Sequence, residues 1–253
     1  GLIQSGYDKT RILASNPSTP KLDKLKEEFG IQITQSNDEA CQFADAIVLA
    51  VKPQMMGDMC ADLQQNNDLS GKLFLSIAAG LPVSRLQEML GGEYPVVRIM
   101  PNTPSLLSKG MSGMYADNTV SEDDRTYVDD VMNSVGETVW VEEEDGINGV
   151  IAAAGSSPAY FFLFLQAMQD EAINMGFDKA QSRLMVQQAM LGAAEMVCHN
   201  PDLELSELRA QVTSKGGTTA AAVNTLIDQG LSDIVSNAMR AAVARAEEMA
   251  KQL

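Results

Sequence analysis

Hydrophobic residues follow two different patterns along the chain. In the first half, short aliphatic runs alternate with longer amphipathic stretches, which is typical of a parallel sheet whose strands are joined by helices. The expected strands are residues 11–15, 31–34, 46–51, 73–77, 96–100 and 138–141. Beyond Glu144 the expected elements are long helices, at residues 158–175, 179–198, 218–229 and 231–251. The pattern therefore predicts an α/β domain at residues 1–143, followed by an all-helical domain at residues 144–253.

Residues with capping preferences mark the ends of several expected helices. Thr19 and Pro20 have the residue types of an N-cap and a first-turn proline, and Gly30 would end that helix. Two further amphipathic helices are expected at residues 82–90 and 121–134. Alanine-rich stretches in the second half would permit close contact between helices, which favours an oligomeric helical interface.

Composition narrows the classes of protein that fit. The 253 residues suffice for two domains with their own cores. A formal net charge of −16 and a pI near 4.4 would repel phosphate backbones, so we expect no nucleic-acid partner. No apolar run approaches the ~20 residues that cross a bilayer, and no signal segment opens the chain. We therefore expect a cytoplasmic protein with no membrane partner.

The cysteines give no sign of a cross-linked or metal-binding protein. Cys41, Cys60 and Cys198 are odd in number, scattered and without metal-ligand spacing. Neither a disulfide framework nor a metal site is expected, and the three thiols are interpreted as reduced packing residues.

Small, polar or rigid residues directly follow four of the expected strands. They occupy residues 15–17, 52–53, 78–80 and 101–104. Ligands of open parallel sheets bind beyond the carboxyl ends of the strands, so the four segments together favour a nucleotide-binding cleft. Each segment alone would be an ordinary turn.

Neutral residues at the end of the first expected strand bear on the type of nucleotide. NAD-binding proteins normally carry an acidic residue there, whereas this chain has Ser15 and Asn16. These residues, with Asn37 beyond the next strand, could donate hydrogen bonds to a 2′-phosphate, which a carboxylate would repel. We therefore expect NADP, although both asparagines could instead be turn or cap residues.

A glycine-rich phosphate loop does not precede the strand at residues 11–15. A dinucleotide-binding domain would need such a loop and a preceding strand, about 15–20 residues together. Since residues 1–6 resemble the end of a helix, we expect the missing first strand and loop to lie upstream of Gly1.

A glycine pair interrupts the helical pattern late in the chain, within the sequence VTSKGGTT at residues 212–219. Small hydroxyl residues surround Gly216 and Gly217, and the next expected helix begins at Thr218. Backbone N–H groups at a helix start bind anions, so this turn is expected to bind a carboxylate.

The motifs resemble those of the pyrroline-5-carboxylate reductase family over essentially the whole chain. The most specific are LAVKPQ at 49–54, SIAAG at 76–80, RIMPNTP at 98–104, GSSPAY at 155–160, MLGAA at 190–194 and VTSKGGTT at 212–219. Their order and spacing carry the resemblance more than any single motif does.

The resemblance implies both an architecture and a reaction. A Rossmann-like domain would be followed by an all-α C-terminal domain that forms a homodimer, and dimers of this family can assemble into a decamer. The implied reaction is hydride transfer from NADPH, or from NADH, to the cyclic imine 1-pyrroline-5-carboxylate, giving L-proline in the last step of proline biosynthesis. A protonated imine needs no strong protein acid, which fits a chain whose one histidine, His199, lies in a helix-ending sequence.

The resemblance also assigns substrate-binding residues. Thr219 would be the catalytic residue that hydrogen-bonds the imine nitrogen. The N–H groups of Gly217, Thr218 and Thr219 would hold the substrate carboxylate. Glu144 resembles a family acid close to the substrate, although within the acidic run 142–145 it could equally lie on a solvated face.

The cofactor is expected to contact residues that follow the strands. They are Asn16, Asn37, Ala50, Val51, Lys52, Pro53, Ala78, Ala79, Gly80 and Asn102. Pro53 would stiffen its turn and Lys52 could reach a ribose hydroxyl. The small side chains at residues 78–80 would let the backbone approach the nicotinamide closely. Asn102 would order its loop through side-chain hydrogen bonds.

Two residues depart from the family pattern. Ser157 replaces the second glycine of GSGPAY, and Lys215 replaces the proline of VTSPGGTT. Lys215 could help to attract a carboxylate or could simply face solvent.

Two other functions remain open. A β-hydroxyacid dehydrogenase or related imine reductase would share this plan but use a catalytic lysine, for which Lys179 and Lys215 are the candidates. A helical scaffold that has lost its cofactor loop would bind no NADPH.

Overall fold

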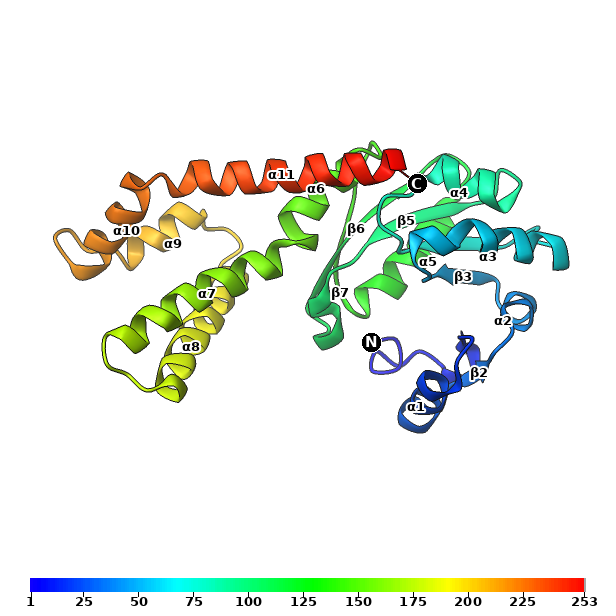
Figure 1. Cartoon of the computed structure of the whole chain (residues 1–253), viewed down its shortest axis with the longest axis horizontal. Coiled ribbons are helices and arrows are strands. Elements are labelled where there is room, and N and C mark those ends of the chain that lie inside the picture. Colours follow the sequence, from blue (N-terminus) through cyan, green and yellow to red (C-terminus); the bar gives the residue numbers. More distant parts are fainter. Residues whose placement is uncertain (253) are drawn as a thin grey trace. The chain divides into compact units, whose positions relative to one another are not determined.

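The computed structural model describes residues 1–252, which form two compact units. The first unit contains residues 1–156 and the chain from residue 242 onward, and the second contains residues 157–241 (Figure 1). The strands all belong to the first unit and the second is helical. An α/β part followed by a helical part is the architecture that the hydrophobic pattern predicts.

The first unit contains two β-sheets. Strand β1 (Leu13–Ser15) pairs in parallel with β2 (Gln32–Thr34), and the other strands form a five-stranded sheet in the order β3-β4-β5-β6-β7. These are β3 (Ala46–Leu49), β4 (Leu73–Ser76), β5 (Val96–Met100), β6 (Gly110–Ala116) and β7 (Gly136–Trp140). Strands β3, β4 and β5 are parallel to one another, so their carboxyl ends lie at one edge of the sheet.

The sequence does not predict β6, and this strand makes the sheet mixed rather than wholly parallel. It runs antiparallel to β5 and parallel to β7. Gly113, in the middle of β6, packs against helix α6 (Gly146–Val150) so closely that an added Cβ would lie 2.5 Å from Val150 Cγ1. The small residues of β6 therefore serve close packing, and they hide the aliphatic pattern by which the other strands are found.

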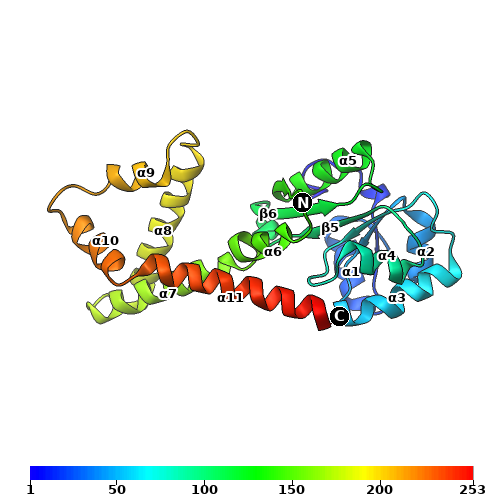
Figure 2. The same cartoon turned by 90° about the horizontal axis from the view of Figure 1, so that it is seen from above.

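Helices cover both faces of the five-stranded sheet. They are α3 (Pro53–Asn66) and α4 (Val83–Leu90) on one face and α5 (Glu122–Asn133) on the other. Helices α1 (Thr19–Phe29) and α2 (Asn37–Phe43) contact the two-stranded sheet instead, and two 3₁₀ turns, η1 (Lys9–Arg11) and η2 (Thr103–Leu107), complete the unit. Phe74 of β4 is buried in the cluster formed by α3 and α4, whereas its neighbours Leu73 and Leu75 join the cluster that contains Val128 of α5. Figure 2 accordingly shows α5 on the opposite side of the sheet from α3 and α4.

The capping residues explain most of the helix boundaries. Gly30 ends α1 in the left-handed conformation, with φ 67°, and donates its N–H to Lys26 O, as its position predicts. Ser121 accepts from the N–H of Asp124 at the start of α5. The assignment of Thr19 as an N-cap is wrong by one residue, because Ser18 has the extended N-cap backbone and Thr19 is the first helical residue.

The cysteines differ in their surroundings. Cys41 and Cys60 are buried in the core, and burial raises the pKa of the Cys60 thiol to about 11. All three thiols are free. Cys198 is exposed, so its interpretation as a packing residue is wrong within this single chain.

The second half of the chain is helical throughout its elements. Helix α6 runs into a π-helical turn, Ile151–Gly155, which still belongs to the first unit. The second unit contains α7 (Ser157–Asn174), α8 (Lys179–Cys198), α9 (Leu205–Gln211), α10 (Thr218–Asp228) and the first part of α11 (Leu231–Gln252). Helices α7 and α8 pack against each other (Figure 1). Four of these helices lie where the pattern predicts them, and α9 is additional.

One expectation about apolar segments needs correction. The continuous helical segment Gly146–Asn174 is 29 residues long and is apolar enough, by length and composition alone, to cross a membrane. Its α7 portion exposes Phe161, Phe162, Leu163 and Phe164 in the single chain. The statement that no apolar run approaches membrane length is therefore wrong, because this run becomes continuous only when α6 and α7 join.

Candidate active site

Three of the four predicted strand-end segments meet at one edge of the five-stranded sheet. Leu49, the last residue of β3, lies opposite Ser76, the last residue of β4. Ser76 lies opposite Arg98, and β5 runs two residues further, to Met100. The segments at residues 50–53, 77–82 and 101–104 leave the sheet from these ends. The fourth segment follows β1, which belongs to the separate two-stranded sheet.

The loop between β4 and α4 carries Ala78, Ala79 and Gly80. Ser76 is fully buried and its Oγ accepts from the N–H of Ala78 at 3.4 Å. Ala78 is itself buried, and Gly80 adopts φ 81°, a left-handed conformation that favours glycine. This loop therefore presents small side chains and a sharply turned backbone at the edge of the sheet.

The segment after β3 runs directly into a helix. Lys52 is the N-cap residue of α3, without a capping side-chain hydrogen bond, and Pro53 is the first helical residue. Ala50 and Lys52 are exposed, whereas Val51 packs partly against the core. Pro53 thus has a structural role as the first-turn proline of a helix that the sequence does not predict.

Side chains from two strand ends meet beyond the two-stranded sheet. Ser15 Oγ donates to Asn37 Oδ1 at 2.6 Å, so the structure brings these two expected cofactor residues together. Asn16 Oδ1 accepts from the N–H and Oγ of Ser18, both at 3.0 Å. Asn16 therefore has the turn-forming role that the sequence left as an alternative, and its amide nitrogen makes no hydrogen bond within residues 1–252.

Asn102 joins three segments of the first unit. Its Nδ2 donates to Ala154 O at 3.0 Å, and its Oδ1 accepts from the N–H of Met111 at 2.9 Å. The prediction that Asn102 orders its loop through side-chain hydrogen bonds is confirmed.

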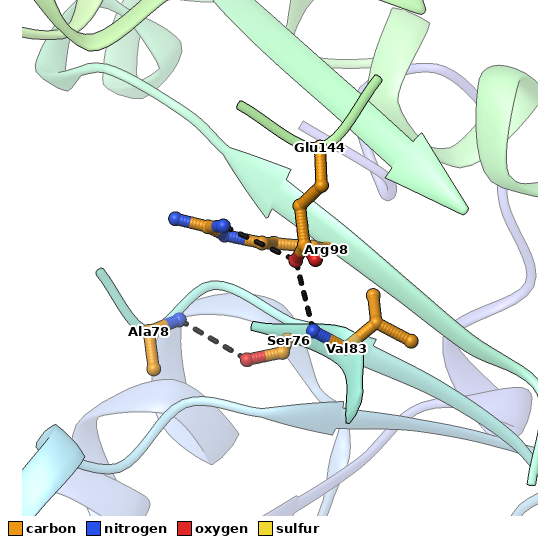
Figure 3. A network of polar contacts seen from close by, with 5 residues as sticks. All are labelled: Ser76, Ala78, Val83, Arg98 and Glu144. Carbon is orange, nitrogen blue, oxygen red and sulfur yellow. Dashed lines mark hydrogen bonds and ion pairs between the residues drawn. The ribbon is translucent and has the colours of Figure 1, made fainter. Parts of the chain in front are cut away.

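Glu144 lies beside the β4–α4 loop and is largely buried. Its Oε1 accepts from the N–H of Val83 at 2.8 Å and from Nη1 of Arg98 at 3.1 Å (Figure 3). The side chain of Arg98 is 7 % exposed and that of Glu144 is 24 % exposed. Glu144 thus has specific partners, which excludes the alternative of a solvated acidic face for this residue.

The charge of Glu144 also reaches Tyr115 on β6, which lies opposite Arg98 in the strand pairing. Burial raises the pKa of Tyr115, and the negative charges of Glu144, Asp117 and Glu143 raise it further.

Sequence reasoning missed Arg98 as a functional candidate. An arginine within the aliphatic strand VVRIM is the available signal, because a buried arginine requires an anionic partner. The sequence does not show which carboxylate that partner is, since Glu144 is 46 residues away.

The turn at residues 212–217 lies in the second unit and ends at the start of α10. Gly216 has φ 74°, and an added Cβ at Gly217 would lie 2.6 Å from Ser214 Oγ, so both positions favour glycine. Gly217 is the N-cap residue of α10 and no side chain caps this helix. Its own N–H donates to Ser214 O at 3.0 Å, so it is not the free donor that the sequence predicts. The N–H groups of Thr218 and Thr219 have no partner within the helix, and both side chains are exposed. The turn thus offers backbone donors and a hydroxyl, as a carboxylate site requires.

Other candidate residues have simpler surroundings. His199 caps α8, and its Nδ1 lies 2.8 Å from Glu195 O, which fits the structural role that the sequence indicates. Lys179 and Lys215 are exposed. Residues 1–252 contain no group of three His, Cys, Asp or Glu side chains placed to hold a metal ion.

Comparison with known families gives matches to both halves of the chain. Residues 144–249 match the pyrroline-5-carboxylate reductase dimerisation family, and residues 1–80 match the family of coenzyme F420-dependent NADP oxidoreductases. The chain is 56 % identical over 251 residues to a pyrroline-5-carboxylate reductase of Vibrio alginolyticus, covering 99 % of this chain and 92 % of that protein.

Solved structures agree with these matches. A pyrroline-5-carboxylate reductase from Coxiella burnetii has a TM-score of 0.93 at 38 % identity, covering 98 % of this chain and 92 % of that one. The Plasmodium falciparum enzyme with NADP bound has a TM-score of 0.85 at 30 % identity, covering 98 % and 91 %. On identity, coverage and fold together, the chain belongs to the pyrroline-5-carboxylate reductase family.

Proposed function

We propose that the chain reduces 1-pyrroline-5-carboxylate to L-proline with hydride from NAD(P)H, the last step of proline biosynthesis. Membership of the family supports the reaction. The observation that carries it within the chain is the open start of α10, where a glycine turn places the Thr219 hydroxyl beside unpaired N–H groups. Residues 1–143 would bind the cofactor, and residues 144–253 would bind the substrate and form the dimer.

The chemistry of the residues at the strand ends fits a dinucleotide. The small side chains of Ala78, Ala79 and Gly80 would let the backbone approach a flat ring, and Ala50 to Pro53 would line the adjoining ribose. When bound, NAD(P)H supplies hydride to the carbon of the C=N bond. Asn102 would hold the segment after β5 in place through its side-chain hydrogen bonds to Ala154 O and to the N–H of Met111.

Neutral donors favour NADPH over NADH. Ser15, Asn16 and Asn37 place hydroxyl and amide groups, rather than a carboxylate, at the end of β1. The unused amide nitrogen of Asn16 would donate to a 2′-phosphate.

The substrate has a carboxylate and an imine nitrogen, and α10 offers a group for each. The N–H groups of Thr218 and Thr219 would hold the carboxylate, where the helix dipole favours negative charge. The N–H of Gly217, which the sequence also assigned to the carboxylate, would have to exchange its bond to Ser214 O to take part. Thr219 Oγ1 would hydrogen-bond the imine nitrogen and so stabilise its protonated, more electrophilic form. The family resemblance assigns Glu144 to the substrate as well, and its Oε1 is fixed by Val83 and Arg98.

Assembly and location follow from the same family assignment. The match to a dimerisation family and the exposed phenylalanines of α7 support a homodimer through the C-terminal helices. Further assembly into a decamer and a cytoplasmic location are parts of the proposal.

The test is steady-state loss of NADPH absorbance with 1-pyrroline-5-carboxylate, using the full-length protein. Thr219→Ala should lower kcat by about a hundredfold, because a hydrogen bond that strengthens in the transition state is removed. Thr219→Ser should retain most of the activity.

A matched control is Thr213→Ala in the same turn, whose hydroxyl donates to Arg209 O rather than facing the start of α10. It should leave kcat within about twofold of the wild type. A folded wild-type protein that oxidises no NADPH with this imine would refute the proposed reaction. Equal loss in Thr213→Ala and Thr219→Ala would refute the role of Thr219.

A further inference from the structure

We infer that Arg98 and Glu144 are positioning residues that hold the β4–α4 loop, residues 78–82, in the conformation that binds the nicotinamide cofactor. The inference rests on the proposed function, since it takes this loop as part of the cofactor site. The argument concerns the first unit alone, to which all these residues belong.

The loop is fixed at both of its ends. At its start, the N–H of Ala78 donates to Oγ of the buried Ser76. At its end, the N–H of Val83, the first residue of α4, donates to Glu144 Oε1 (Figure 3). Between them, Leu81 is fully buried in the core. The backbone of Ala79 and Gly80 is therefore held from both sides.

Glu144 performs the capping that α4 cannot provide for itself. The N-cap residue of α4 is Pro82, whose side chain has no hydrogen-bonding group, and no capping bond is present there. A carboxylate at a helix start satisfies a free N–H and is favoured by the helix dipole. Glu144 supplies this carboxylate from a distant segment, 61 residues along the chain.

Arg98 holds Glu144 in place. It lies opposite Ser76 in the sheet, so the same strand pair that anchors the start of the loop also anchors the residue that caps its end. Glu144 is the one carboxylate that forms an ion pair with Arg98 within residues 1–252. Because Arg98 is 6 % exposed, water cannot replace that partner well. Without Glu144, the N–H of Val83 has no acceptor. Without Arg98, Glu144 still accepts from Val83 but is no longer held against β5, so in both cases the end of the loop is fixed less firmly.

The experiment measures NADPH binding alone, by isothermal titration calorimetry without imine, on Arg98→Met and Glu144→Ala. Each variant should raise the Kd for NADPH about tenfold. We expect a smaller effect than the roughly hundredfold loss of rate that a 1 Å misplacement of reacting groups causes. The double variant should bind NADPH about as weakly as whichever single variant has the higher Kd, because the two side chains act as one unit.

Asp129→Asn is the matched control for a general loss of stability. Asp129 accepts from Trp140 Nε1 at 2.9 Å and from Thr138 Oγ1 at 3.0 Å, so it is also part of a partly buried polar network, but one between α5 and β7. Its Kd for NADPH should stay within about twofold of the wild type. Circular dichroism checks that each variant is folded.

Three results would overturn the inference. The first is an unchanged Kd for NADPH in folded Arg98→Met and Glu144→Ala, and the second is an equal rise in Asp129→Asn. The third is a raised KM for the imine in Glu144→Ala with an unchanged Kd for NADPH, which would make Glu144 a substrate contact only. A wild-type protein that binds NADPH but does not reduce the imine would refute the proposed reaction instead, and the binding measurements would still test the positioning role.

Discussion

The two partners of the buried ion pair should contribute unequally to stability. Arg98 has a 7 % exposed side chain, whereas Glu144 is 24 % exposed and has a second partner in the N–H of Val83. Removing Glu144 leaves a buried cation without its partner and a helix N–H without its acceptor. Removing Arg98 leaves a carboxylate that still accepts from Val83 and reaches water.

The magnitudes follow from this difference. Loss of one partner from a buried pair costs about 3–5 kcal/mol, and partial exposure places Glu144→Ala near the lower value, at about 3 kcal/mol of the free energy of unfolding. Arg98→Met removes one charge-assisted hydrogen bond and should cost about 1 kcal/mol. The double variant should be more stable than Glu144→Ala alone, because the unpaired cation is gone.

Equilibrium urea denaturation is the assay, followed by the fluorescence of Trp140, the single tryptophan, which lies in the same unit. All variants are compared at one protein concentration, so that subunit association contributes equally. If Arg98→Met lowered the free energy of unfolding as much as Glu144→Ala does, the reasoning would be refuted. The bond to Val83 and the exposure of Glu144 would then not reduce the cost of removing Arg98.

Three further predictions concern other parts of the first unit. Gly113→Ala should destabilise the protein by about 1–3 kcal/mol through overpacking against Val150, and Val150→Ala in the same chain should restore part of the loss in a urea denaturation. Asn102→Ala should speed amide hydrogen exchange at Met111, whose N–H loses its acceptor; unchanged exchange would contradict that role. The free energy of unfolding should fall as the pH rises from the usual thiol pKa to about 11, because burial raises the folded pKa of Cys60 while the unfolded thiol ionises earlier; Cys60→Ala should flatten this slope.

Local signals predicted the helices that carry their own boundary residues. Helix α1 has Pro20 in its first turn and Gly30 at its end, and both act within a few residues of sequence. Strand β6 was missed because its packing against α6 requires glycine at residue 113, and an aliphatic pattern cannot form there. Helix α3 was missed because Pro53 was interpreted as part of a turn, although proline also favours the first helical position.

The candidate site also contains features that local sequence reveals and features that depend on residues far apart in the chain. The turn at residues 212–219 could be found from sequence because its glycines and hydroxyls are adjacent. The capping of α4 by Glu144 could not, because it depends on a pairing that only the folded sheet creates. Within the acidic run 142–145, the family resemblance selected Glu144 as an acid close to the substrate, but nothing in the sequence indicates that it caps α4.

The distance along the chain between Glu144 and its partners has a consequence for synthesis. Val83 and Arg98 leave the ribosome 61 and 46 residues before Glu144 does. During that interval Arg98 has no carboxylate to accompany it into the sheet, and burying it alone is costly. We therefore expect β5 to stay solvated on the nascent chain, and the β4–α4 loop to settle only after β7 has emerged. Closing loops of this length also slows folding. The β4–α4 loop should therefore become ordered late in the folding of the newly made chain.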